Sequence, residues 1–110
     1  MHTSLFDLSE NQLTTLPAVL GKLTELQWLD CKSNKISQID DAVYNLLELR
    51  ELYLGKNKLS TLSNKIGQLS SLERLDLSSN DISTLPEGLA ALQRLESLNL
   101  EQNKLQTIPA

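Results

Sequence analysis

The sequence is poor in the residues that most active sites need. Its 110 residues include one histidine, one cysteine and four glycines. His2 alone cannot supply a histidine-based catalytic triad or a histidine-containing zinc cluster. The glycines are dispersed, so they form no phosphate-binding loop. We therefore expect a protein without catalytic residues, without a cofactor and without a bound metal.

Signals for secretion, membrane insertion and nucleic-acid binding are also missing. Cys31 has no cysteine partner within a monomer, and the N-terminal residues lack the apolar run of a signal peptide. No stretch is long and apolar enough to span a membrane. The net charge is -4, and Lys and Arg are scattered, which argues against nucleic-acid or anionic-membrane binding. We expect a cytoplasmic protein, or one exported by a signal-less route or cut from a longer chain.

What the sequence does contain is a repeat. Asparagine recurs every 23 residues, and each copy follows the pattern L-x-x-L-x-L-x-x-N-x-L-x-x-L-P-x-x-L-x-x-L-x-x. The asparagines are Asn11, Asn34, Asn57, Asn80 and Asn103. Apolar residues fill the leucine positions, and Thr3 is the exception. Self-similarity at a fixed period indicates a repeat architecture in which each copy forms one coil of a solenoid.

The L-x-L alternation within each copy has the period of a β-strand, with leucines on one face and variable residues on the other. One such strand cannot bury its apolar face alone, so stacked copies should form a parallel sheet with strands about 4.8 Å apart. The rest of each copy returns behind this sheet, which makes the stack curve with its strands on the inside. The asparagines follow the strands, where an amide can satisfy turning main-chain groups. We predict that they form a structural ladder.

The pattern L-x-x-L-x-L-x-x-N-x-L resembles the leucine-rich repeat. Its 23-residue length, with L-P after the asparagine segment, is similar to a subclass found in Ras-signalling and scribble-type scaffolds, Roco-type GTPases and bacterial repeat proteins. The resemblance implies an α/β fold, a right-handed solenoid with five parallel strands on the concave face. Short helical, 3-10 or extended returns would form the convex face. The implied function is non-catalytic protein–protein interaction, with no particular partner.

We expect a single domain over residues 1–110, with repeats at 1–25, 26–48, 49–71, 72–94 and 95–110, the last incomplete. Repeat two is the least regular, because Asp40 replaces proline, Tyr44 replaces glycine and Leu47 takes a usually polar position. Packing against repeat three is the favoured interpretation of Tyr44 and Leu47, and a second binding surface is the alternative. Neither end carries a capping helix, which suggests a fragment or minimal array, or ends that self-associate.

The variable residues of the strands are the candidate partner-binding set. They are Leu5, Asp7, Trp28, Asp30, Glu51, Tyr53, Arg74 and Asp76. In-register stacking would cluster Leu5, Trp28 and Tyr53 on the first three strands. Because Trp and Tyr dominate interface hot spots, we predict that Trp28 and Tyr53 anchor a protein partner, with the charged residues as a polar rim.

Several alternatives stay open. Trp28 could merely cover neighbouring strands, and charge pairs such as Glu51 with Arg74 could merely solvate the sheet. Asp7 and Asp30 are neighbouring like charges, but two carboxylates are too few for a calcium site and Lys32 can relieve their repulsion. The chain could also be the recognition segment of a larger kinase, GTPase or ubiquitin ligase, or a self-associating structural protein.

Overall fold

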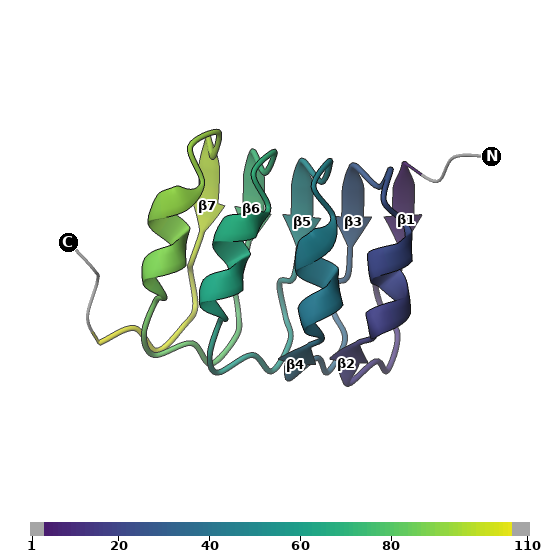
Figure 1. Ribbon diagram of the computed structural model, residues 1–110. Helices are drawn as coiled ribbons and strands as arrows, with labels where there is room; N and C mark the ends of the chain where they lie inside the picture. Colours follow the sequence, from purple (N-terminus) through teal and green to yellow (C-terminus); the bar gives the residue numbers. More distant parts are fainter. Residues whose placement is uncertain (1–3, 107–110) are drawn as a thin grey trace.

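Five short strands form one parallel sheet in the computed structural model, which describes residues 4–106. The strands are β1 (Leu5–Asp7), β3 (Trp28–Asp30), β5 (Glu51–Tyr53), β6 (Arg74–Asp76) and β7 (Ser97–Asn99). Each pairs in parallel with the corresponding strand of the next coil, in the order β1-β3-β5-β6-β7. The solenoid predicted from the repeat is therefore confirmed (Figure 1).

The first four coils return through short 3-10 helices, which form one layer over the sheet (Figure 1). These are η1 (Ala18–Lys22), η2 (Asp41–Asn45), η3 (Asn64–Gln68) and η4 (Glu87–Ala91). Pro17 and Pro86 precede η1 and η4, and proline favours such a start because its φ is already fixed. Where proline is absent, Asp40 and Ser63 cap the helix by accepting the N–H two residues on, at 2.9 and 3.0 Å. The two departures from the repeat thus preserve the return.

A second, two-stranded sheet lies at the edge of the solenoid and is not predicted by the repeat pattern. It pairs β2 (Thr15–Leu16) with β4 (Gln38–Ile39) in parallel. The corresponding residues of coil three, 61 and 62, are not in a strand. Adjacent coils are therefore joined differently on the two sides of coil two.

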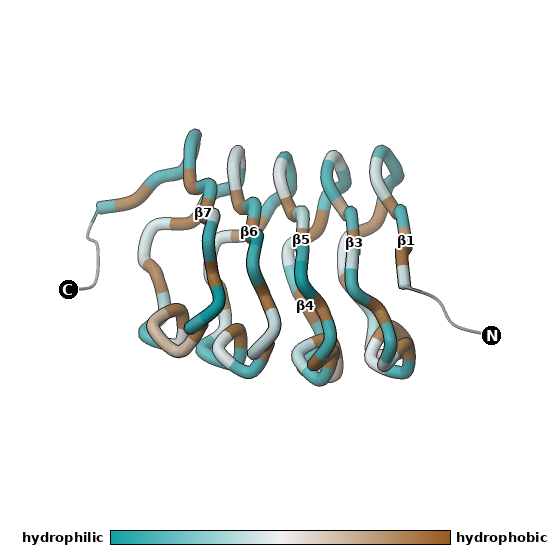
Figure 2. The backbone as a smooth tube through the Cα atoms, turned by 90° about the horizontal axis from the view of Figure 1, so that it is seen from above, coloured by the Kyte–Doolittle hydropathy of each residue, from teal (hydrophilic) through white to brown (hydrophobic). Residues whose placement is uncertain are grey.

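The leucine positions of the stacked coils share one apolar interior, and hydrophobic segments recur at the same point of every coil in Figure 2. Leu29, Leu52 and Leu75 are 0%, 1% and 1% exposed. The equivalent residues of the outer coils, Phe6 and Leu98, are partly buried and 38% exposed, because described coils cover them on one side only. The predictions for His2, Thr3 and Ile108 lie outside the described residues.

Each strand of the five-stranded sheet is followed, three residues after its end, by a left-handed residue that the sequence does not reveal. The φ angles of these residues lie between 53° and 61°, and none of them is glycine. They are Glu10, Ser33, Lys56, Ser79 and Gln102. Such a conformation costs an L-residue about 1–2 kcal/mol. Because each precedes a ladder asparagine directly, we infer that the hydrogen bonds of the asparagine offset this cost.

Cys31 fills a leucine position and is fully buried. Burial, aided by the charges of Asp30 and Asp7, raises the pKa of its thiol from 9.0 to about 12. The folded thiol therefore keeps its proton at a pH where the unfolded thiol has lost it. We expect the free energy of unfolding to fall as the pH rises from about 9 to about 12, and Cys31 to have no such effect below that window.

Urea unfolding followed by circular dichroism at increasing pH would measure this decline. The Cys31→Ala variant should lose stability less steeply than the wild type across the window, since it lacks the titrating thiol. Parallel curves for the two proteins would contradict the expectation, because the tyrosines and lysines titrate equally in both.

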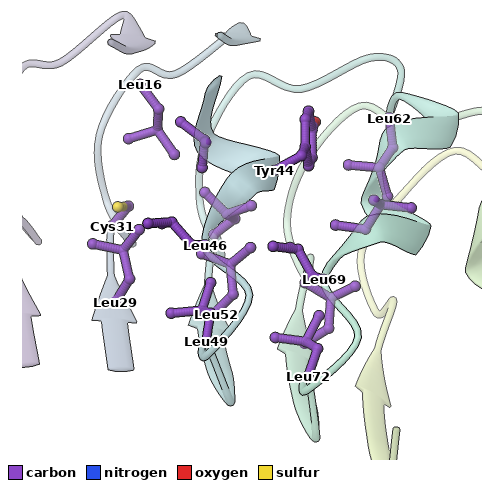
Figure 3. Packing of buried hydrophobic residues seen from close by; sticks show 14 of the residues in the cluster. Leu16, Leu29, Cys31, Tyr44, Leu46, Leu49, Leu52, Leu62, Leu69 and Leu72 are labelled. Carbon is purple, nitrogen blue, oxygen red and sulfur yellow. The ribbon is translucent and has the colours of Figure 1, made fainter. Parts of the chain in front are cut away.

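Tyr44 holds the returns of coils two and three apart. Gly21 and Gly67 take this place in coils one and three, where an added Cβ would lie 2.4 or 2.6 Å from a main-chain oxygen of the next return. Tyr44 is instead an aromatic side chain, 2% exposed, that projects toward Leu62 of coil three (Figure 3). The structure thus places Tyr44 against repeat three, as the favoured interpretation expects, whereas Leu47 is 56% exposed.

Candidate partner-binding surface

The first and third residues of the five strands face away from the interior, and we call the surface that they form the concave face. The parallel register arranges them in two rows across the sheet. The first row contains Leu5, Trp28, Glu51, Arg74 and Ser97, and the second contains Asp7, Asp30, Tyr53, Asp76 and Asn99. The structure therefore brings all eight candidate residues onto one face.

Trp28 and Tyr53 form the aromatic centre of this face. Their ring centroids are 5.8 Å apart and their planes are tilted by 54°, which lies within the range of favourable aromatic pairs. Both side chains are partly exposed, so Trp28 covers its neighbour and still presents surface to solvent. Leu5, beside Trp28 in the register, is 67% exposed. An apolar strip thus crosses β1, β3 and β5.

Glu51 fixes the direction of the Tyr53 side chain, because the Tyr53 hydroxyl donates a hydrogen bond to Glu51 Oε1. Burial and, to a lesser extent, the bond to Glu51 raise the pKa of the Tyr53 phenol to about 12. The ring therefore points back along its strand toward Glu51 and sideways toward Trp28. Arg74 lies beside Glu51 in the register, but within the described chain no ion pair joins the two.

Four residues of the second row stabilise the strand ends, a role that sequence reasoning missed. The Oδ1 atom of each accepts the N–H group two residues later, at 2.9–3.0 Å. These residues are Asp7, Asp30, Asp76 and Asn99. Such Asx turns are typical of Asp and Asn where a chain changes direction. The signal was present in the sequence as a column of Asp and Asn that only Tyr53 interrupts.

The acidic residues of the face differ in their availability to a partner. Ser9 donates its hydroxyl and its N–H to Asp7 Oδ1, at 2.6 and 2.9 Å, and these bonds lower the pKa of the Asp7 carboxyl. Asp30 is only 5% exposed, and its Oδ2 lies 3.5 Å from Lys32 Nζ. Lys32 is thus placed to relieve the repulsion between the two carboxylates. Asp7 remains exposed, whereas little of Asp30 can be reached.

A shallow hollow of about 140 Å³ lies toward the other end of the concave face. Its lining residues are Tyr53, Arg74, Leu75, Asp76, Ser97 and Asn99. Most of them are polar, whereas pockets for small molecules are mostly apolar. The apolar strip of the concave face is therefore confined to β1, β3 and β5, and the face is polar over β6 and β7, an arrangement that suits a protein surface.

Metal clusters and membrane-spanning helices are absent from residues 4–106. No three side chains of His, Cys, Asp or Glu gather there as a metal site would require. No helix in this range combines the length and the apolar character needed to cross a bilayer.

The asparagine ladder connects successive coils. From the second coil on, each side-chain Nδ2 donates to main-chain carbonyls of its own and the preceding coil, and each Oδ1 accepts an N–H of the preceding coil. Asn34, Asn57 and Asn80 are 7%, 5% and 5% exposed. Asn11, in the first coil, is exposed, and among residues 4–106 it bonds only to carbonyls of its own coil. The amides thereby satisfy main-chain groups hidden from water.

A second hollow, of about 550 Å³, opens beside Tyr44, and we call it the groove; residues of coils one, two and three line it. Between coils one and two, the N–H groups of Ser37 and Asp40 each donate to the preceding coil at 2.9 Å. Between coils two and three, among the residues described, the main-chain bond at this edge runs from Lys58 N–H to Ile36 O at 2.8 Å, and the pairing stops there. The groove therefore lies where the second sheet ends, at β4, with Tyr44 in its lining.

The repeat and the fold occur in other proteins. A family model described as leucine rich repeat matches residues 24–82 and 48–105. A leucine-rich repeat protein of Leptospira interrogans is 37% identical, with a TM-score of 0.93, over 96% of this chain and 27% of that one. An internalin of Listeria monocytogenes is 26% identical, with a TM-score of 0.79, over 94% of this chain and 33% of that one. This chain thus spans about a third or less of either protein's length. No curated protein is significantly similar in sequence.

Proposed function

Because the chain belongs to the leucine-rich repeat family, we propose that it is a non-catalytic module that binds a protein partner on its concave face. The exposed pair of Trp28 and Tyr53 carries this proposal. Trp and Tyr are the commonest anchors of protein interfaces. Tyr53 also stands where the other coils have the Asp or Asn of an Asx turn. This coil therefore lacks that stabilising hydrogen bond and carries a partly exposed aromatic ring instead. Local rules are usually broken where function requires it.

The charged residues around the aromatic pair form the proposed polar rim. Asp7, Arg74 and Asp76 keep exposed or partly exposed side chains, and Glu51 holds the Tyr53 ring in place. Rim charges chiefly affect the association rate and the choice of partner, not the affinity. Asp30 is proposed to act through Lys32, whose ammonium group it holds at 3.5 Å.

Replacing Trp28 with alanine is expected to weaken binding to a captured partner by ~2 kcal/mol or more. The fold should survive, because Trp28 is partly exposed and lies outside the apolar interior. Calorimetric titration of the purified partner would measure the loss. Leu47→Ala is the matched control, since it removes an exposed apolar side chain from the convex side and should change affinity by less than about 0.5 kcal/mol. Equal affinities for wild type and Trp28→Ala would disprove the anchor.

A second candidate function follows from the greater length of the similar proteins. The chain would then be the recognition segment of a larger enzyme, such as a kinase, a GTPase or a ubiquitin ligase. Sequencing the full reading frame would reveal the catalytic domain. Self-association through the outer coils is a further possibility from the sequence, and light scattering of the purified chain tests it. The cytoplasmic location and the 23-residue subclass stay predictions.

A further inference from the structure

Gly55 carries a main-chain N–H group that has no acceptor within residues 4–106. In the other four coils, the N–H at this place donates to an Asp or Asn two residues earlier, but Tyr53 offers no oxygen there. The Gly55 carbonyl is satisfied, because it accepts from Ser33 N–H and from Asn57 Nδ2. Gly55 is buried, and buried main-chain donors rarely lack partners. An acceptor for this N–H therefore has to come from outside the described residues.

The Gly55 N–H is directed toward the second row of the concave face, because the main-chain bonds of Leu54 and Lys56 on either side of it match those of the other coils. The equivalent N–H groups point to side-chain oxygens of the second row, and the register gives Gly55 the same orientation. The Tyr53 ring turns the other way, toward Glu51 and Trp28. Gly55 itself has no side chain, and an added Cβ would lie 3.0 Å from Ser78 Oγ. Because Gly55 is buried and closely surrounded, an acceptor that reaches this N–H must be slender.

The charges nearby decide which acceptor fits. Asp30, Glu51 and Asp76 occupy neighbouring positions of the two rows, with Arg74 as the one cation beside them in the register. The three carboxylates outnumber this guanidinium, so the local charge is negative and would repel a carboxylate or a phosphate. The positive charge of Lys32 does little to reduce this repulsion, because Lys32 is paired with Asp30. A neutral amide carbonyl can accept the N–H without this repulsion. The apolar strip lies beside the Gly55 N–H, so the partner residue next to that carbonyl should have an apolar side chain.

Resting on the proposed partner-binding function, we propose that the partner presents an extended peptide segment whose main-chain carbonyl accepts the Gly55 N–H. An apolar side chain next to that carbonyl packs on Trp28 and Tyr53. Adjacent residues of an extended chain are about 3.3 Å apart, so one short segment reaches both places. Gly55 supplies the directional contact, and the aromatic pair supplies the buried area.

The free protein provides the first test. Tyr53→Asp supplies the missing oxygen, as at Asp30 and Asp76, so the Gly55 amide proton should exchange with solvent about fivefold more slowly than in the wild type. Tyr53→Ala removes the ring without supplying an acceptor and should leave this exchange unslowed. Hydrogen exchange followed by NMR measures both. An equal rate in wild type and Tyr53→Asp would overturn the proposal, because the N–H would not then be free.

Short random peptides displayed on phage and selected on the wild-type protein provide the second test. Peptides that require Trp28 should slow exchange of the Gly55 amide about fivefold or more, and replacing one peptide amide by an ester, a weaker acceptor, should abolish the effect. Peptides that require Trp28 but leave Gly55 exchange unchanged overturn the carbonyl contact and leave the proposed function standing. A selection without Trp28-dependent peptides would overturn both.

Discussion

Replacing Asn57 with alanine is expected to lower the free energy of unfolding by about 3–5 kcal/mol. Its Nδ2 donates to Leu54 O in its own coil, at 3.0 Å, and to Cys31 O in the preceding coil, at 3.1 Å. Its Oδ1 accepts Ile36 N–H at 2.9 Å. Because the residue is 5% exposed, alanine would leave main-chain groups of two coils without partners, each costing about 1–3 kcal/mol.

The matched control is Asn11→Ala, which removes an exposed ladder residue. Within the part of the chain that the structure describes, Asn11 bonds only to Leu8 O and Ser9 O of its own coil, both at 3.0 Å. Water can replace its amide there, so about 1 kcal/mol should be lost. Asn57→Asp should cost at least as much as Asn57→Ala, because a carboxylate oxygen would face carbonyl oxygens where Nδ2 now donates. Urea unfolding measures all three variants. Equal losses at both asparagines would show that the ladder does not connect the coils.

The strands and their register could be predicted because the repeat period determines both. Once coils of equal length stack, Leu29, Leu52 and Leu75 must meet on one side of the sheet, and Trp28 must lie beside Glu51. Stacking the copies in this way buries the leucine positions of the inner coils in one continuous interior. The neighbourhood of Trp28 and Tyr53 followed from the same constraint, without knowledge of any side-chain conformation.

What the sequence did not reveal depends on hydrogen bonds at single positions. Asp7, Asp30 and Asp76 looked like a charged rim, but each also accepts a main-chain N–H two residues on. Hydropathy records that a residue is polar, not which atom it bonds. The importance of Gly55 became visible only through those turns. In the other four coils an Asp or Asn oxygen accepts the equivalent N–H, and Tyr53 supplies no such oxygen to Gly55. The sequence located the candidate surface. The structure then distinguished the carboxylates that stabilise turns from the Gly55 N–H, which has no acceptor among the described residues.

Replacing Tyr44 with alanine is expected to lower the free energy of unfolding by about 3 kcal/mol. The ring is 2% exposed and fills the space between the returns of coils two and three. Glycine at this place in coils one and three accompanies close contact between returns, but coils two and three are also spaced by β3, β5 and the ladder. The returns of coils two and three therefore cannot move close enough to fill the space around an alanine. A cavity continuous with the neighbouring groove would remain.

Tyr44→Phe is the matched control for this prediction. The Tyr44 hydroxyl has no hydrogen-bond partner among the residues described, so phenylalanine should cost less than about 1 kcal/mol. Chemical unfolding of both variants would separate loss of the ring from loss of the hydroxyl. If Tyr44→Ala matched the wild type in stability, coils two and three would have to close as their neighbours do. The tyrosine would then be holding open a groove that the rest of the solenoid does not require.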